Sequence, residues 1–363
     1  MGVNNFVADA TVNAALYSEK VWREKLPSAF WARMFDFPMP GQAGFSDAQY
    51  LTDVKTGAIT GYQNKEGGPI RIVRDLVSGF GDTIRFPHVL ALRGEGITGT
   101  SGQTLEGNEE EMSVGNYSIT LEEYAHAVAD KSPLGRKRTQ FDILKEMGNQ
   151  IMTWGVTKTD KLIWDALYGG TPTTIIYPDG VAATTGILND TAHRVTMKML
   201  RQAKAIAETE TVGSRFIIEP LVMNGKNCYI VVLPPDAELD LKEDSEFKQS
   251  LQQAGNKGMD NPIFAGADYI TVDGLVIYSH QKAKTVTNWG AGANVAGARI
   301  KLLGANALCY AMGAAPSLIE QDGDYKRKKG IAFQMFMKAS RPVFENLDYG
   351  SLELRVNCQR TTF

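Results

Sequence analysis

The sequence predicts an α+β fold in which a long hairpin extends from a body of one long helix and several strands. Three features of this chain of 363 residues lead to that expectation. Two segments with the alternation of strands flank a glycine-rich stretch, and a stretch of about 29 residues with the period of a helix follows them. Strand alternation then returns after residue 330.

The hairpin is predicted over residues 81–128. Its two arms alternate apolar with other residues, as half-buried strands do, at Ile84, Phe86, His88 and Leu90 and at Tyr117, Ile119 and Leu121. Between the arms, residues 94–115 hold six glycines, five glutamates and no Lys or Arg. Loops longer than about 12–15 residues are uncommon inside a compact domain. We therefore expect this segment to project and to lie on another copy of the chain.

Residues 1–80 are predicted to form an N-terminal arm. One or two short helices, broken near Pro27, contain the aromatic residues Trp22 and Trp31, and a glycine-rich extended segment follows. Aromatic side chains in a thinly packed arm need a surface to bury against. Packing on the body of the same chain is one alternative, and docking of Trp22 and Trp31 on a neighbouring copy is the one that we expect.

A long spine helix dominates the next segment, residues 129–186. Thr139 and Asp142 match a capping box, and the helix is expected to end at Gly169 because glycine commonly ends helices. Its apolar residues recur every three or four positions, at Phe141, Leu144, Met147, Ile151, Trp154, Leu162 and Ala166. At ~1.5 Å per residue the helix is a rod of ~43 Å, which suits a structural spine of a peripheral domain.

Residues 187–330 are predicted to form a second, axial domain of mixed helix and strand. Its expected elements are an amphipathic helix, a buried strand, a surface helix and a hairpin, at residues 195–206, 229–233, 239–253 and 270–279. Asp273-Gly274 is a strong hairpin-turn signal. Residues 331–363 are expected to return to the sheet of the peripheral domain.

No set of residues indicates catalysis, a cofactor or a metal. Residues 94–99 match GxGxxG, but no helix follows, as a dinucleotide site requires. The four histidines lack the spacing of a metal site. Glu109, Glu110 and Glu111 are adjacent on a loop, where acid–base chemistry would lack a fixed geometry. The sequence therefore predicts a protein that is not an enzyme.

Composition excludes several other classes. A formal charge of −3 gives no basic footprint of a dedicated DNA binder, so any contact with nucleic acid is expected to be weak and non-specific. Three distant cysteines indicate neither a disulfide framework nor a zinc ribbon. Neither a signal peptide nor an apolar run of ~20 residues is visible. We expect synthesis in a cytoplasm and no association with a membrane.

Two basic clusters could meet the acidic hairpin of a neighbouring copy. A solvated surface is the alternative for both clusters, and opposite charges would chiefly steer association and fix its register. The basic residues are Arg136, Lys137 and Arg138, and Lys326, Arg327, Lys328 and Lys329. The acidic residues are Glu106, Glu109, Glu110 and Glu111. The sequence does not distinguish which cluster makes the contact.

From residue 80 onward the chain resembles the major capsid proteins of tailed bacteriophages. Their fold, also called the Johnson fold, is shared with encapsulins, and the local residues are similar to its podophage-type branch. The resemblance rests on the order of arm, hairpin, spine helix, axial domain and return strands. It also rests on four segments, GDTIRFPHVLALRGEGITG, LEGNEEEMSVGNYSITLEEYAHAV, NPIFAGADYITVDGLVIYSH and FENLDYGSLELRV.

The resemblance implies a virion subunit that forms pentamers and hexamers through the axial domain and encloses double-stranded DNA. It implies a portal, a possible decoration protein and a separate scaffolding protein, since no charged helical scaffolding segment is visible. Assembly would take place in the host bacterial cytoplasm. Two alternatives remain at this point: an encapsulin-like shell around a protein cargo, and a soluble α/β enzyme with a glycine-rich lid loop.

Overall fold

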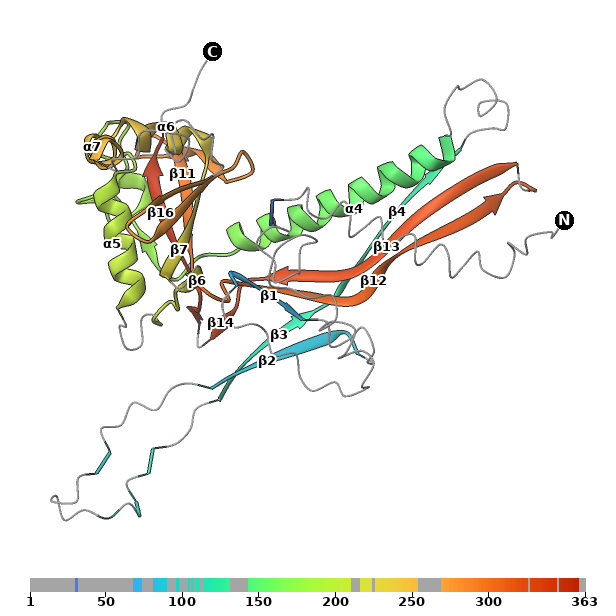
Figure 1. Cartoon of the computed structure of the whole chain (residues 1–363), viewed down its shortest axis with the longest axis horizontal. Coiled ribbons are helices and arrows are strands. Elements are labelled where there is room, and N and C mark those ends of the chain that lie inside the picture. The colour runs from blue at the N-terminus through green and yellow to red at the C-terminus, as the bar shows by residue number, and fades with distance from the viewer. Residues whose placement is uncertain are drawn as a thin grey trace.

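The structure is a computed structural model in which two sheets are joined by one long helix (Figure 1). It describes residues 68–73, 81–89, 114–130, 143–209, 216–223, 226–253, 269–325, 327–344 and 346–358. It also describes residues 30–31 and the short pieces 96–97, 104, 106–107 and 109–110. Thr139, Asp142 and Trp22 lie outside these residues.

The first sheet has four strands in the order β1-β12-β13-β4. Their bounds are Ile70–Val73, Leu308–Gly323, Lys328–Ser340 and Glu122–Ala129. The spine helix α4, Ile143–Tyr168, lies along the sheet (Figure 1). It ends where the sequence predicts, and Gly170 has the positive φ of 64° that favours glycine after a helix.

Only one face of this sheet packs against α4. Phe333, Met335 and Met337 on β13 point toward the helix and are fully buried, and Phe333 contacts the ring of Trp154. Side chains alternate along a strand, so Ala332 and Gln334 lie on the opposite face. We call this opposite face, formed by the odd-numbered residues of β4, the even-numbered residues of β13 and the β12 residues that pair with the latter, the open face.

The second sheet has eight strands and takes the order β5-β16-β11-β7-β9-β8, with β10 beside β11 and β6 beside β7. In chain order the bounds are β5 Ile175–Ile176, β6 Leu221–Met223, β7 Lys226–Leu233, β8 Tyr269–Val272, β9 Leu275–Ser279, β10 Thr285–Trp289, β11 Val295–Leu303 and β16 Ser351–Asn357. Helices α5, Met197–Glu208, α6, Pro235–Glu243, and α7, Ser245–Gln253, contribute to the core on one face. Residues of β7 on the other face join the core around the C-terminal end of α4.

Smaller elements complete the described fold. The hairpin strands β2, Thr83–Val89, and β3, Val114–Thr120, pair antiparallel, as the sequence predicts. Strands β14, Val343–Phe344, and β15, Leu347–Asp348, form a short pair. The 3₁₀ turn η4 spans Thr184–Gly186.

The predicted surface helix at 239–253 is two helices. Asp244 separates α6 from α7 with an extended ψ of 133°. Its side-chain Oδ2 accepts a hydrogen bond from the backbone N of Met197 at 3.0 Å. Because the backbone of Asp244 is extended and its carboxylate binds the start of α5, α6 and α7 do not form one continuous helix.

Strand pairing also differs from the predicted division into segments. β12 lies within residues 187–330 but pairs with β13 and β1 in the four-stranded sheet. β16 lies within residues 331–363 but pairs with β11 and β5 in the eight-stranded sheet. β4 begins inside the predicted hairpin yet pairs with β13. Partners distant in sequence decide these pairings, and alternation within one strand does not reveal them.

Candidate assembly surface

The root of the β2–β3 hairpin is fixed to the body by a small apolar cluster. Ile84 and Ile119 face each other across the two strands and are buried against Cys309 and Ala311 of β12. Tyr117 of β3 donates a hydrogen bond from its hydroxyl group to Ser340 at the end of β13. Figure 1 shows the ribbon pointing away from the four-stranded sheet. The hairpin is therefore rigidly attached at its base while its far end projects.

Three of the four predicted acidic residues are described, and all three are exposed. Glu106, Glu109 and Glu110 lie in the segment between β2 and β3, and Glu111 lies outside the described residues. The Glu109 carboxylate accepts a hydrogen bond from the backbone N of Gly107 at 2.9 Å. Gly107 has a φ of 85°, which favours glycine. A local turn thus presents these carboxylates to solvent.

The described basic residues lie at the turn between β12 and β13. Arg327 and Lys328 are exposed, Lys329 is partly exposed, and Lys326 is outside the described residues, as are Arg136, Lys137 and Arg138. Figure 1 shows this turn at the end of the molecule opposite to the hairpin. The structure therefore does not bring the acidic and basic residues together within one chain.

Trp31 lies in the core of its own chain. Its side chain is fully buried, its ring centroid is 4.8 Å from that of Trp164, and its backbone N donates to Asp160 Oδ1 at 3.2 Å. The expectation that Trp31 docks on a neighbouring copy is therefore wrong. Asp160 is a buried carboxylate on α4 whose other oxygen accepts from Trp164 and Lys282. A buried carboxylate needs such donors, and Trp31 supplies one of them.

Sequence reasoning missed a buried group of charges that fastens α4 to the eight-stranded sheet. Arg299 and Lys301 of β11 and Glu353 of β16, which we call the charged trio, are almost completely buried. Arg299 reaches Glu353 at 2.6 and 2.8 Å, and Lys301 Nζ lies 2.8 Å from Glu353 Oε2. Arg299 Nη1 also donates to the backbone O of Tyr168, the last residue of α4. Charged residues inside otherwise apolar strands were the available signal.

The environment of the charged trio keeps Glu353 ionised. Burial by itself would raise the pKa of Glu353, but hydrogen bonds from Arg299 and the charge of Lys301 outweigh it and lower the pKa to about 2. Burial lowers the pKa of Lys301 to about 8, against the attraction of Glu353. These charged side chains stabilise the contact between α4 and the eight-stranded sheet, since removing one would leave its partners buried and unpaired.

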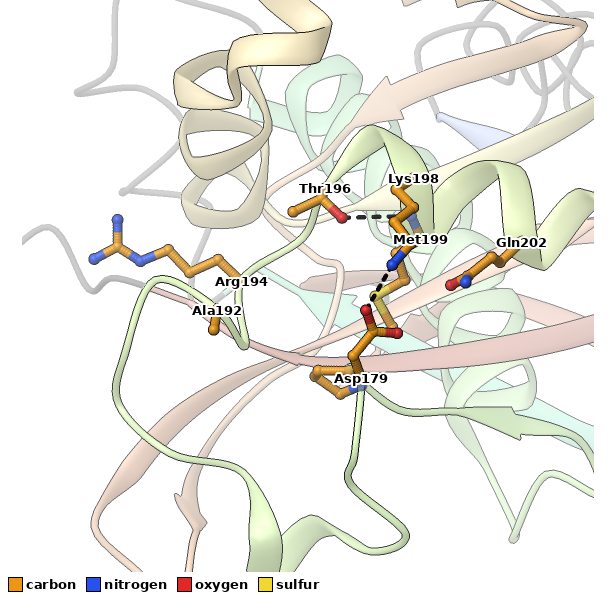
Figure 2. Close-up of a pocket in the computed structure, with 8 residues that line it drawn as sticks. Asp179, Ala192, Arg194, Thr196, Lys198, Met199 and Gln202 are labelled. Carbon is orange, nitrogen blue, oxygen red and sulfur yellow. Dashed lines mark hydrogen bonds and ion pairs between the residues drawn. The ribbon is translucent and has the colours of Figure 1, made fainter.

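A small pocket at the start of α5 offers no comparable chemistry (Figure 2). Lys198 Nζ lies 2.7 Å from Asp179 Oδ2, and both side chains are well exposed. Thr196 Oγ1 accepts a hydrogen bond from the backbone N of Met199 and caps α5. The dashed lines of Figure 2 show these two contacts, which pair surface charges and complete a helix end.

Among the described residues, no three His, Cys, Asp or Glu side chains converge so as to hold a metal ion. None of the described helices combines the length and apolar character of a membrane span.

Comparison with known proteins identifies the family. A family model described as phage capsid protein matches residues 136–341, and a second with the same description matches residues 20–185. The major capsid protein of Pseudomonas phage KPP25 is 25% identical over 298 residues, which cover 70% of this chain and 76% of that protein.

Solved structures show the same fold. The capsid of Ralstonia phage GP4 superimposes with a TM-score of 0.70 at 20% identity, and the cyanophage Pam1 capsid with 0.71 at 17%. Each match covers 82% of this chain and 90% of the other. Neither the encapsulin-like shell nor the soluble enzyme is favoured by these matches. The first family model spans more than half of the sequence, so the chain belongs to the phage capsid protein family and is a structural subunit of a bacteriophage capsid.

Proposed function

We propose that the chain assembles as pentamers and hexamers into an icosahedral shell around packaged double-stranded DNA, with the hairpin of each copy laid over the open face of a neighbour. The observation that carries this proposal is the combination of a projecting hairpin with a sheet whose second face, beyond the part that the hairpin root covers at Cys309 and Ala311, is left uncovered by the described residues. A subunit that is complete alone would need neither feature.

The open face suits a flat partner. Its β4 residues Ala125, Ala127 and Ala129 are exposed, and Ile319 on β12 keeps 48% of its surface exposed. Small side chains leave room for another backbone to approach, and exposed apolar surface gains free energy when it is covered. Stable interfaces bury roughly 1,200–2,000 Å², and a hairpin along a whole sheet contributes to this area without enlarging the core.

The dimensions of hairpin and sheet match. Residues 90–113 lie between β2 and β3, and half of that segment, fully extended, spans about 40–43 Å. β13 has 13 residues, which at about 3.3 Å each also span about 43 Å. A hairpin that starts at the near end of a neighbouring sheet could thus bring its acidic residues to the far end, where the β12–β13 turn lies.

Charge would set the register of this contact. Glu106, Glu109, Glu110 and Glu111 would meet Arg327, Lys328 and Lys329 of the next copy, with Arg136, Lys137 and Arg138 as the alternative cluster. The acidic hairpin residues and the basic β12–β13 turn lie at opposite ends of one chain. The contact is therefore head-to-tail and generates rings where the rotation closes. Such pairing fixes orientation more than it adds affinity.

Contact with DNA would be weak. The described exposed residues of α4 are mixed in charge, with two basic, two acidic and three uncharged side chains: Lys145, Lys161, Glu146, Asp165, Gln150, Thr153 and Thr157. A strongly basic lining would bind the duplex by releasing counterions, and the overall charge of −3 favours no such lining. A separate scaffolding protein, a portal and a possible decoration protein are further proposed partners, with synthesis and assembly in the host bacterial cytoplasm.

Deletion of residues 96–111 tests the proposal. The variant should stay folded and soluble, because the root of the hairpin and both sheets remain, but it should form no closed shells. Negative-stain microscopy with light scattering, with scaffolding protein added where the wild-type chain needs it, distinguishes shells from smaller species. Replacing the segment with Gly and Ser residues at equal length is the matched control and should fail as well. Normal particles from the deletion would contradict the role of the hairpin.

A further inference from the structure

Within the described residues, β4 is an edge strand with one side unpaired. All eight of its residues pair with β13, and none of the described strands pairs with its other side. Native proteins usually protect such edges with Lys, Pro, bulges or covering loops, because an open edge is a template for another strand. The residues of β4 therefore indicate which kind of strand can pair with its unpaired side.

The ladder with β13 shows which backbone groups point outward. The backbone N of Asp130 donates to the O of Lys329 at 2.8 Å, so residues 130 and 329 form a hydrogen-bonded pair. Hydrogen-bonded pairs alternate along an antiparallel ladder. The even-numbered residues of β4 thus direct their backbone groups to β13, and Glu123, Ala125, Ala127 and Ala129 direct theirs to the open side.

The charges that could protect this edge are held by the sheet itself. Glu122 is bound by Lys338 and by the hydroxyl group of Tyr124. Glu123 accepts a hydrogen bond from Gln334 Nε2 at 2.6 Å. From Tyr124 to Ala129 the strand contains no Lys, no Pro and no carboxylate. The edge is long, uncharged over six residues and sterically accessible at its alanines.

We propose that β4 pairs antiparallel with β4 of a second copy, about a two-fold axis perpendicular to the sheet that passes midway between the two Ala125 residues. The inference rests on the proposed function, because a shell requires both copies to turn the same face inward. His126 lies against Trp154 with ring centroids 4.8 Å apart, and Lys158 Nζ lies 4.5 Å from the ring centre of Tyr124. The even-numbered residues of β4 therefore face α4, and a perpendicular two-fold axis keeps both α4 helices on one face.

This symmetry restricts the register. Paired residues point to the same face of a sheet, so even-numbered residues must oppose even-numbered ones. With Ala125 opposite itself, Tyr124 opposes His126, Glu122 opposes Val128 and Glu123 opposes Ala127. No carboxylate meets another, and the outward backbone groups of Glu123 and Ala127 bond each other. Shifting the centre to His126 would place two imidazoles directly opposite, which the Ala125 register avoids.

A disulfide at the axis tests the pairing. In a hydrogen-bonded antiparallel pair the Cα atoms are about 5.5 Å apart, within the range of a disulfide. Shells assembled from Ala125→Cys subunits and then oxidised should yield covalent dimers on a non-reducing gel. Ala129→Cys, equally exposed and on the same face, is the matched control and should yield none. Cys228, Cys309 and Cys358 are buried and should not compete.

A second variant keeps the test independent of thiol chemistry. Ala127→Pro removes an outward N–H and leaves the hydrogen bonds to β13 intact. It should lower the yield of closed shells about tenfold or more relative to Ala127→Ser. If Ala125→Cys subunits form shells but yield no more covalent dimers than Ala129→Cys subunits do, this inference alone is overturned. A wild-type chain that forms no shells even with scaffolding protein would instead overturn the proposed function.

Discussion

The two sheets differ in how many of their faces the described residues cover. In the eight-stranded sheet nearly every residue of β11 and β16 is buried, because α5, α6 and α7 cover one face and the end of α4 packs on the other. In the four-stranded sheet buried and half-buried residues alternate along β13. Among the described residues one sheet is a finished core, and the other keeps a partly uncovered face and an unpaired edge, which we propose that additional copies complete.

The largest expected effect comes from breaking the finished core at the charged trio. Glu353→Gln should lower the free energy of unfolding of the unassembled chain by about 3–5 kcal/mol, because Arg299 and Lys301 would stay buried without their counter-ion. Urea unfolding measures this loss. Glu320→Gln, an exposed carboxylate on β12, should change it by about 0.5 kcal/mol or less.

The same pair of proteins should respond differently to acid. The pKa of Glu353 in the fold lies below its ordinary value of 4.5, so its contribution is complete above that pH and is lost as the pH falls toward about 2. The difference in unfolding free energy between wild type and Glu353→Gln should therefore narrow over this range. A difference that stays constant between pH 5 and pH 2.5 would contradict the role assigned to the carboxylate.

Effects of intermediate size are expected from one variant on each face of the four-stranded sheet, the first on stability and the second on assembly. Met335→Ala, under α4, should cost about 2–5 kcal/mol of unfolding free energy. Ala332→Arg, on the open face, should leave the stability of the unassembled chain within about 0.5 kcal/mol but should prevent closed shells. Unfolding curves and microscopy of the same two variants give both results. An Ala332→Arg variant that assembles normally would show that the open face stays uncovered.

The smallest effect is expected from charge. Changing Glu106, Glu109, Glu110 and Glu111 to Lys should slow assembly most at low ionic strength, since screening is weakest there: the Debye length is about 30 Å at 0.01 M and about 8 Å at 0.15 M. Light scattering over time at several salt concentrations measures the rate. An effect of equal size at every concentration would argue against charge pairing.

Local patterns predicted much of the fold. The turn at Asp273-Gly274 joins β8 to β9, and both residues have the positive φ that such a two-residue turn requires. The apolar stripe of α4 and the buried strand β7 follow in the same way, because each depends on residues within a few positions of one another. The phage capsid family was likewise inferred from the order of these elements.

What the sequence did not reveal depends on distant partners. Trp31 is buried against Trp164 of α4, and its backbone N donates to Asp160, 129 residues away; nothing within the N-terminal arm indicates these contacts. The charged trio joins residues 54 positions apart. Glu353 and Lys301 become partners only when β16 lies beside β11, and this pairing crosses the domain boundary that the sequence predicted.

The position of β16 has a consequence for synthesis. β16 lies between β5 and β11, yet the ribosome delivers it more than fifty residues after β11 and long after β5. Until Ser351–Asn357 emerge, β11 lacks its neighbour and Arg299 and Lys301 lack their anion. A nascent or truncated chain therefore cannot close its eight-stranded sheet. Because β16 is made after every other described strand of this sheet, we expect subunits that lack it to be excluded from the shell.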